Sequence, residues 1–303
     1  MAADHNHWLR RRGELSREGW ESFVDGSEPG WEHTGLRVAE LASGDELALP
    51  GAGTEAMVVP LAGSFTVTHD GGHGAATTEL TGRASVFDGA TDVLYLGASS
   101  TGTLTGRGRV AVATSPTGED RPSRYLAASE TPVELRGAGQ SSRQVHNFGV
   151  PGALDAVRLI VCEVVTPAGN WSSYPPHKHD ESIPGHESRL EEIYYFEAAT
   201  ERDREAAGEP FGVFSAYSSA AGEIEIDGLV HSGDIALVPF GYHGPAVAAP
   251  GYDLYYLNVM AGPDPERAWL ISDDPAHAWV RDTWAGQAVD PRLPYSSEKE
   301  GRR

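Results

Sequence analysis

The sequence of 303 residues is poor in cysteine and in lysine, and it contains no long apolar run. Its single cysteine, Cys162, excludes an internal disulfide bond. The apolar runs at 159–165 and 235–238 are far too short to span a bilayer. The first residues, MAADHNHWLRRRG, have no apolar core of the kind that a secretory signal requires. These absences predict a cytoplasmic protein that is not inserted in a membrane.

Positive charge is also scarce. The chain has 23 Lys and Arg residues against 44 Asp and Glu residues, a formal net charge of -21, and its lysines are Lys178 and Lys299. An acidic surface repels nucleic acid and anionic lipid, so neither is expected as a partner. A small molecule is the expected partner, and self-association into a homo-oligomer is left open. An anionic ligand would need a local cationic site that opposes the overall charge.

Turn residues and strand-forming residues are abundant. The 36 glycines and 20 prolines make up about a fifth of the chain, and the segments between them are rich in Val, Leu and Tyr. This mixture favours an all-β fold. The strand-and-turn pattern of residues 35–116 returns over residues 145–262, with an acidic residue before an apolar strand and then a Gly-Asp or Asp-Gly turn. The repetition predicts two related β-barrels or sandwiches in tandem.

The expected boundaries follow from this repetition. They are an N-terminal extension at 1–30, an N-terminal barrel at 31–140, a C-terminal barrel at 141–272, and a helix with a tail at 273–303. The segment DDPAHAWVRDTWAG predicts a short helix that ends at Gly286. The final SSEKEGRR is expected to be disordered.

Two histidines follow a double proline in NWSSYPPHKHD. Successive side chains of an extended chain point to opposite faces, so His177 and His179 share one face and Lys178 points the other way. Two neutral imidazoles on one face can hold one divalent ion. Taken alone, the pair is a weak signal, because HxH also occurs by chance as two solvated loop histidines.

Two later segments add possible ligands. In LEEIYYF, Glu191 and Glu192 are adjacent, so only one of them can face inward. In GDIALVPFGYHGP, a strand ends in a Pro-x-Gly turn that delivers His243. Three histidines and one carboxylate from separate strands would form a mixed nitrogen and oxygen site for Zn, Mn, Fe, Co or Ni.

HKH, EEIYYF and VPFGYH, in this order, resemble the two cupin motifs, with a longer loop between the histidine pair and the glutamate. More narrowly, NWSSYPPHKHD, LEEIYYF, VPFGYHGP, YYLNVMAGP and DDPAHAWVRDTW together resemble the 5-deoxy-glucuronate isomerase family of bacterial myo-inositol catabolism. The resemblance is specific over roughly residues 170–284 and weaker over the first half. It implies an all-β bicupin fold and the conversion of 5-deoxy-D-glucuronate to 2-deoxy-5-keto-D-gluconate.

The resemblance also implies the metal ligands. In the cupin pattern the ligand glutamate directly precedes a hydrophobic–aromatic pair, which favours Glu192 over Glu191. The first half has Glu55 but no HxH before it, so that barrel is expected to be structural. One divalent ion would be held by His177, His179, Glu192 and His243.

An aldose–ketose isomerase moves hydrogen between neighbouring carbons, through an enediol or through a hydride shift. A divalent ion serves both routes by polarising the carbonyl. The sequence leaves the base open among the unused glutamate, Glu191, a tyrosine such as Tyr242, and a hydroxide on the metal.

Three further residues are predicted to bind the substrate. Arg143 is the candidate for its carboxylate, because a guanidinium grips a carboxylate with two parallel hydrogen bonds. Tyr194 could bond sugar hydroxyls. Lys178 is included as a nearby cation, although its orientation argues against a Schiff base. Two rival functions remain: a metal-dependent dioxygenase on the same frame, similar to quercetinase, and a non-catalytic sugar-binding cupin.

Overall fold

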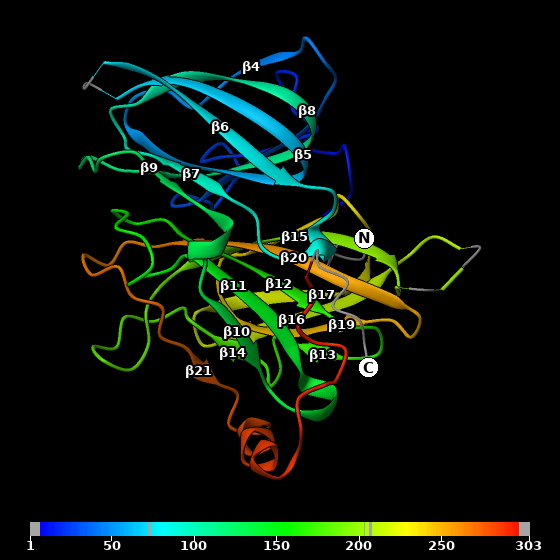
Figure 1. The fold of residues 1–303 in the computed structure, drawn as a ribbon. Coiled ribbons are helices and arrows are strands. Elements are labelled where there is room, and N and C mark those ends of the chain that lie inside the picture. The colour runs from blue at the N-terminus through cyan, green and yellow to red at the C-terminus, as the bar shows by residue number, and fades with distance from the viewer. Residues whose placement is uncertain (1–6, 72–73, 203, 206–207, 297–303) are drawn as a thin grey trace.

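The computed structural model describes residues 7–71, 74–202, 204–205 and 208–296. Residues 1–6 of the expected extension and 297–303 of the expected disordered tail lie outside this part. The described chain consists of strands joined by loops and short 3₁₀ helices (Figure 1), which confirms the all-β prediction. None of its helices has both the length and the apolarity needed to cross a membrane.

The first half of the chain forms one eight-stranded sheet, drawn in blue and cyan in Figure 1. Its strands follow the order β2-β3-β8-β5-β7-β9, with β4 paired to β8 and β6 paired to β5. The bounds are β2 (Ser22–Val24), β3 (Gly35–Leu41), β4 (Glu46–Ala48), β5 (Thr54–Asp70), β6 (Ala75–Arg83), β7 (Val93–Leu96), β8 (Thr101–Pro116) and β9 (Arg124–Leu126).

The second half contributes two sheets that pack on each other. The seven-stranded sheet has the order β1 (Leu9–Arg10), β18 (Ile235–Val238), β15 (Glu191–Thr200), β20 (Tyr252–Ala261), β12 (Ile160–Thr166), β11 (Arg143–Gly149) and β10 (Val133–Arg136). The six-stranded sheet has the order β17 (Gly222–Val230), β16 (Gly212–Ser219), β19 (Tyr242–Ala248), β14 (His177–Lys178) and β21 (Ser272–Asp273), with β13 (Trp171–Ser172) paired to β19.

The N-terminal extension is shared between the halves. Its strand β1 pairs with β18 of the second half, with Leu9 opposite Ala236. Its strand β2 pairs with β3 of the first half. The extension therefore ties the two sheets together.

Three apolar cores fill the spaces between these sheets. One lies inside the first half, one lies between the two halves, and one lies between the seven- and six-stranded sheets. Strand β15 shows how alternation divides the cores: Ile193 and Tyr195 enter the core between the halves, whereas Tyr194 and Phe196 enter the core of the second half.

Two buried carboxylates, one from each half, bind backbone groups of the opposite half. Glu55 of the first half accepts hydrogen bonds from the backbone N–H groups of residues 157–159, at 2.7–2.8 Å. Glu191 of the second half accepts them from the N–H groups of residues 32–34, at 2.7–3.2 Å. Each carboxylate thus fixes a loop of the opposite half, and this explains the acidic residue that precedes an apolar strand in both halves.

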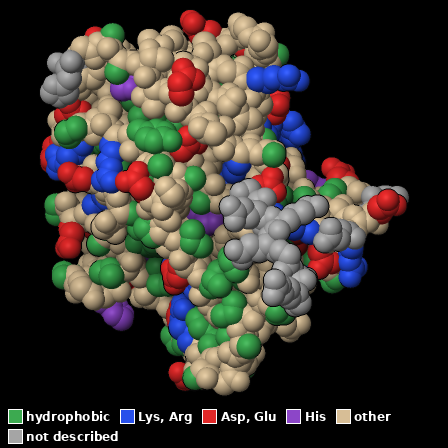
Figure 2. All heavy atoms as spheres, viewed as in Figure 1, with side chains coloured by type: hydrophobic (Ala, Val, Ile, Leu, Met, Phe, Trp, Pro, Cys, Tyr) green, Lys and Arg blue, Asp and Glu red, His purple; other side chains and the backbone are tan. Residues whose placement is uncertain are grey.

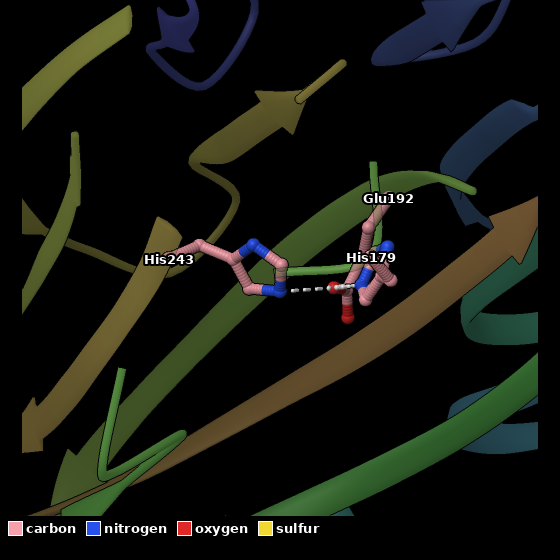
Figure 3. Close-up of side chains that lie close together, drawn as sticks. All are labelled: His179, Glu192 and His243. Atoms are coloured by element: carbon pink, nitrogen blue, oxygen red, sulfur yellow. Dashed lines mark hydrogen bonds and ion pairs between the residues drawn. The ribbon is translucent and has the colours of Figure 1, made fainter. Parts of the chain in front are cut away.

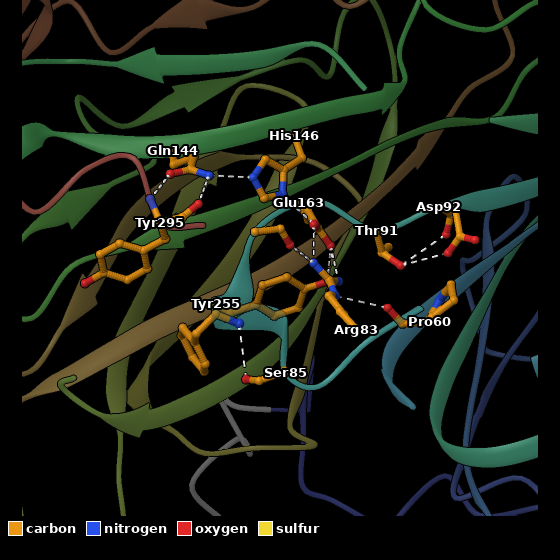
Figure 4. Close-up of polar contacts among 12 residues, drawn as sticks. Pro60, Arg83, Ser85, Thr91, Asp92, Gln144, His146, Glu163, Tyr255 and Tyr295 are labelled. Carbon is orange, nitrogen blue, oxygen red and sulfur yellow. Dashed lines mark hydrogen bonds and ion pairs between the residues drawn. The ribbon is translucent and has the colours of Figure 1, made fainter. Parts of the chain in front are cut away.

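A buried ion pair adds a second link (Figure 4). Arg83, at the end of β6, makes two hydrogen bonds of 2.7 Å to Glu163 in β12. Glu163 also lies 2.6 Å from Nδ1 of His146 and accepts a bond of 2.8 Å from the Tyr255 hydroxyl. The pair joins a strand of the first half to the sheet of the second.

Four 3₁₀ helices occur in the described chain: η1 (Val86–Asp88), η2 (Ala128–Glu130), η3 (Gly139–Ser141) and η4 (Ala278–Gly286). The helix η4 ends at Gly286, as the sequence predicts. On the face seen in Figure 2, acidic and basic side chains are interspersed.

Candidate metal centre and substrate cavity

His179, Glu192 and His243 meet inside the second half (Figure 3). Their ligand atoms all lie within 4.8 Å of one another, and all three residues are buried. Oε2 of Glu192 lies 2.9 Å from Nε2 of His179 and 3.0 Å from Nε2 of His243. Glu192 reaches this point from β15 and His243 from β19, so the seven- and six-stranded sheets both supply ligands.

His177 lies beside this trio. It pairs with His243 across β14 and β19, and their ring centroids are 4.6 Å apart, whereas the centroid of His179 is 6.4 Å away. In all three histidines Nδ1 lies against a backbone carbonyl, which leaves Nε2 as the free ligand atom. The pairs are His177 with Pro175 at 3.3 Å, His179 with Leu190 at 3.1 Å, and His243 with Gly241 at 3.1 Å.

The donor set fits a divalent ion. Nε2 of His243 is buried and makes no hydrogen bond to any described residue, although Glu192 is close. An orphaned imidazole nitrogen that faces a carboxylate is expected where a cation binds both groups. Imidazole and carboxylate ligands suit Zn, Mn, Fe, Co or Ni alike.

The protonation states point the same way. Burial opposes charge on Glu192, but the hydrogen bond with His179 and the close approach of His243 outweigh burial and lower its pKa to about 2. Burial lowers the pKa of His177 well below the usual value, whereas the hydrogen bond and charge of Glu192 raise the pKa of His179 despite its burial. A metal ion bound at Nε2 of His179 would take the place of that proton. An ionised carboxylate and a neutral imidazole are the forms that a metal binds.

A cavity of about 530 Å³ opens beside these residues. One wall is a face of the seven-stranded sheet, and the other comes from β14, β21 and η4 with the loops around them. The sheet supplies Arg136, Arg143, Val145, Val164, Glu192, Tyr194, Tyr256 and Asn258. The opposite wall consists of Ser173, His177, His186, Trp269, Ile271, Ser272, Asp273 and Arg281.

Arg143 carries an unbalanced charge in this cavity. It is 5% exposed, donates a bond of 3.0 Å to the carbonyl of Ser141, and has no carboxylate within 4.0 Å among the described residues. Burial and the like charges of Arg136 and Arg281 lower its pKa to about 10. By contrast, Arg136 pairs with Glu134 and Arg281 pairs with Asp273. The cavity therefore favours an anionic ligand at Arg143.

Tyr194, a predicted substrate-binding residue, lines the cavity, with its hydroxyl 3.3 Å from the hydroxyl of Ser173. Sequence reasoning missed Asn258, whose buried side-chain nitrogen has no hydrogen-bond partner among the described residues. Trp269, which the sequence placed in the core or the pocket wall, lines the cavity, and its buried ring nitrogen also has no hydrogen-bond partner among the described residues. The signal for Asn258 was a polar residue inside the apolar strand YYLNVMAG. Both groups offer hydrogen-bond donors to a ligand.

Three predicted residues do not reach the cavity. Glu191 faces the first half because it alternates with Glu192, and its carboxylate is occupied by backbone N–H groups. Tyr242 alternates with His243 and stacks on Tyr217, with ring centroids 5.5 Å apart.

The ammonium of Lys178 points away from the histidine face. It donates bonds of 2.6, 2.7 and 2.8 Å to three carboxylates. Its charge is therefore neutralised locally, and these carboxylates hold the strand that carries the histidines. They belong to Asp180, Glu181 and Glu187.

Solved structures with the same fold include remote relatives. Oxalate decarboxylase of Lactobacillus farciminis is 12% identical, with a TM-score of 0.61 over 88% of each chain. Bacillus subtilis oxalate decarboxylase, 11% identical with a TM-score of 0.55 over 83% of this chain and 74% of that one, has Mn(II) centres. At this identity the likeness concerns the fold alone, and it confirms the predicted bicupin architecture.

Nearer relatives cover most of the chain. The 5-deoxy-glucuronate isomerase of Geobacillus kaustophilus is 40% identical over 260 residues, which is 84% of this chain and 88% of that protein. The enzyme of the same name from Bacillus subtilis strain 168 is 36% identical over 248 residues, 81% of this chain and 86% of that one. The crystal structure of an IolB-like protein from Salmonella typhimurium LT2 has a TM-score of 0.79 at 32% identity, covering 90% of this chain and 98% of that one. A family model described as KduI/IolB matches residues 8–280, so the chain belongs to the KduI/IolB family, as its motifs predicted.

Proposed function

We propose that this protein is a metal-dependent 5-deoxy-glucuronate isomerase, which converts 5-deoxy-D-glucuronate to 2-deoxy-5-keto-D-gluconate in the cytoplasmic breakdown of myo-inositol. Relatives of 34–40% identity that carry this name support the reaction. The observation that carries the proposal is one cavity with a histidine–carboxylate centre at one end and the unpaired, buried Arg143 at the other. The free, buried thiol of Cys162 suits a reducing compartment.

The metal would be held by His177, His179, Glu192 and His243. When bound, a divalent ion would polarise the substrate carbonyl and offset the negative charge that develops on its oxygen. The histidine rings are held in place by their Nδ1 contacts with backbone carbonyls, so their Nε2 atoms need little rearrangement to bind.

The remaining cavity residues would hold the substrate. The guanidinium of Arg143 would bind the carboxylate through two parallel hydrogen bonds. Tyr194 and Asn258, which lie between the two ends, would donate to hydroxyls. Burial raises the pKa of Tyr194 well above its usual value, so its hydroxyl stays protonated and acts as a donor. His186 and Asp273 also line the cavity, and either can accept a proton from a substrate carbon.

The donors and arginines of the cavity favour a uronate over the apolar aromatic substrate of a dioxygenase. The test is to incubate purified protein with 5-deoxy-glucuronate, before and after chelation and after reloading with each candidate metal. NMR of the product and an oxygen electrode would be read together. We expect ketose formation without oxygen uptake. Ketose formation should be lost on chelation and restored by metal. Oxygen consumption, or uronate binding without turnover under every metal, would contradict the proposal.

Variants connect this activity to the centre. His243→Ala and His177→Ala should lose bound metal and at least about a hundredfold in kcat while remaining folded, because the core between the two sheets is apolar and neither histidine belongs to it. His231→Ala is the matched control, since His231 is partly exposed and outside the cavity. Full metal occupancy in both test variants would exclude this ligand set.

A further inference from the structure

The cavity wall formed by the seven-stranded sheet is ordered in rows. Strand register places Tyr194 opposite Asn258, Tyr256 opposite Val164, Val164 opposite Val145, and Arg143 opposite Arg136. Because alternate residues share a face, these rows follow one another along the strands. From the metal end, the rows are Glu192, then Tyr194 with Asn258, then Tyr256 with Val164 and Val145, then Arg143 with Arg136.

The third row is largely apolar, whereas the rows on either side of it are polar. Val164 and Val145 both line the cavity, and their side chains are only 6% and 1% exposed. The hydroxyl of Tyr256 is engaged with that of Ser173 at 3.0 Å. Rows of alternate residues are about 6.6 Å apart along a strand. For a ligand whose carboxylate binds Arg143, the carbon bonded to that carboxylate would therefore lie nearest to this row and meet the methyl groups of the two valines.

An apolar row next to the candidate carboxylate site suits one class of substrate. If the proposed function holds, the substrate has a carbonyl and hydroxyl at carbons 1 and 2, hydroxyls at carbons 3 and 4, a methylene at carbon 5 and a carboxylate at carbon 6. We propose that Val145 and Val164 pack against the carbon-5 methylene and make the enzyme specific for 5-deoxyuronates. A hydroxyl on carbon 5 would lose its water without gaining a partner, which discriminates by roughly ten- to a hundredfold in an apolar site.

Near-isosteric variants test this specificity. Val145→Thr and Val164→Thr add a hydroxyl with little change of volume. The readout is kcat/KM for 5-deoxy-glucuronate divided by kcat/KM for glucuronate. Glucuronate closes a six-membered ring that the deoxy sugar cannot form, but this solution effect cancels when a variant is compared with wild type. We expect the quotient to fall by at least about fivefold in one or both variants. If glucuronate turnover is too slow to measure, the inhibition constant of glucuronate divided by KM for 5-deoxy-glucuronate replaces the quotient and should fall in the same way.

Val213→Thr is the control, because Val213 lies on β16 at 36% exposure, outside the cavity. Its quotient should equal that of wild type. If the threonine variants do not fold, Val145→Ala and Val164→Ala make room for the hydroxyl and should shift the quotient in the same direction. An unchanged quotient in folded, metal-loaded variants would overturn the specificity proposal alone. Absence of wild-type turnover of 5-deoxy-glucuronate with any metal would overturn the proposed function and this inference together.

Discussion

Glu191 and Glu192 are neighbours with the same side chain, yet they face different parts of the molecule. Alternation along β15 turns Glu192 into the histidine centre and Glu191 toward the first half. Metal binding should therefore be lost in Glu192→Gln and retained in Glu191→Gln. Metal content of the two purified variants, measured side by side, decides the register. Loss of metal in the Glu191 variant alone would reverse the assignment.

Arg143 supports a second prediction at the scale of one residue. Arg143→Lys keeps a positive charge but loses the planar, two-pronged geometry, so KM for the uronate should rise while metal content stays the same. The loss in kcat/KM should be about 1–3 kcal/mol, the range of a hydrogen bond to a charged group.

A substrate analogue without the carboxylate provides the control for Arg143. It should react equally with wild type and with Arg143→Lys, because it makes no contact that the variant removes. Arg121→Lys is a matched variant at a partly exposed arginine outside the cavity and should leave KM unchanged. Wild-type kinetics on the uronate in both Arg143→Lys and Arg143→Ala would place the carboxylate elsewhere.

At the scale of elements, local patterns predicted the motif strands well. Alternation placed His177 and His179 together and Lys178 opposite, and the Pro-x-Gly turn delivered His243 to them. Asn258 was missed because it reaches the cavity through the register of β20 with β12 and β15, strands distant in sequence. Register depends on tertiary packing, which a single sequence does not display.

The strand β1 was missed for a related reason. Its two residues, Leu9 and Arg10, have too short a pattern to indicate a strand, and they pair with β18, more than 200 residues away. The same dependence explains Glu191, whose partners lie in the other half of the chain. Sequence patterns thus predicted which segments form strands more completely than they predicted which strands meet.

The reciprocal carboxylates lead to a prediction about the loops that they fix. Each accepts three backbone hydrogen bonds across the halves, so Glu55→Gln and Glu191→Gln should each lower the free energy of unfolding by roughly 1–3 kcal/mol. Urea unfolding followed by circular dichroism measures the change. Glu119→Gln is the control, because that side chain is 69% exposed and should shift stability by less than about 0.5 kcal/mol. Stabilities equal to the control would mean that these loops are held by other contacts.

For the whole molecule, the link between Arg83 and Glu163 couples the stability of the halves to pH (Figure 4). Burial alone would raise the pKa of Glu163, but the charge of Arg83 and the hydrogen bonds from His146 and Arg83 lower it to about 2. A carboxylate whose pKa falls on folding stabilises the folded state above its unfolded pKa, about 4.5, and this contribution is lost as pH falls toward 2. The free energy of unfolding should therefore decline between about pH 5 and pH 2.

A double-mutant cycle isolates this link from the other carboxylates of an acidic protein. Arg83→Met leaves the charge of Glu163 buried without its partner and should destabilise the fold by about 3–5 kcal/mol. Adding Glu163→Gln removes that charge. The double variant should therefore lose less stability than the two single variants lose together. Its free energy of unfolding should also vary less between pH 5 and pH 2. Arg121→Met, at an exposed pair with Glu119, should change stability by no more than about 1 kcal/mol. Additive losses, or an acid profile that the double variant leaves unaltered, would show that the halves are held together without this ion pair, by the apolar core between them and the backbone bonds of Glu55 and Glu191.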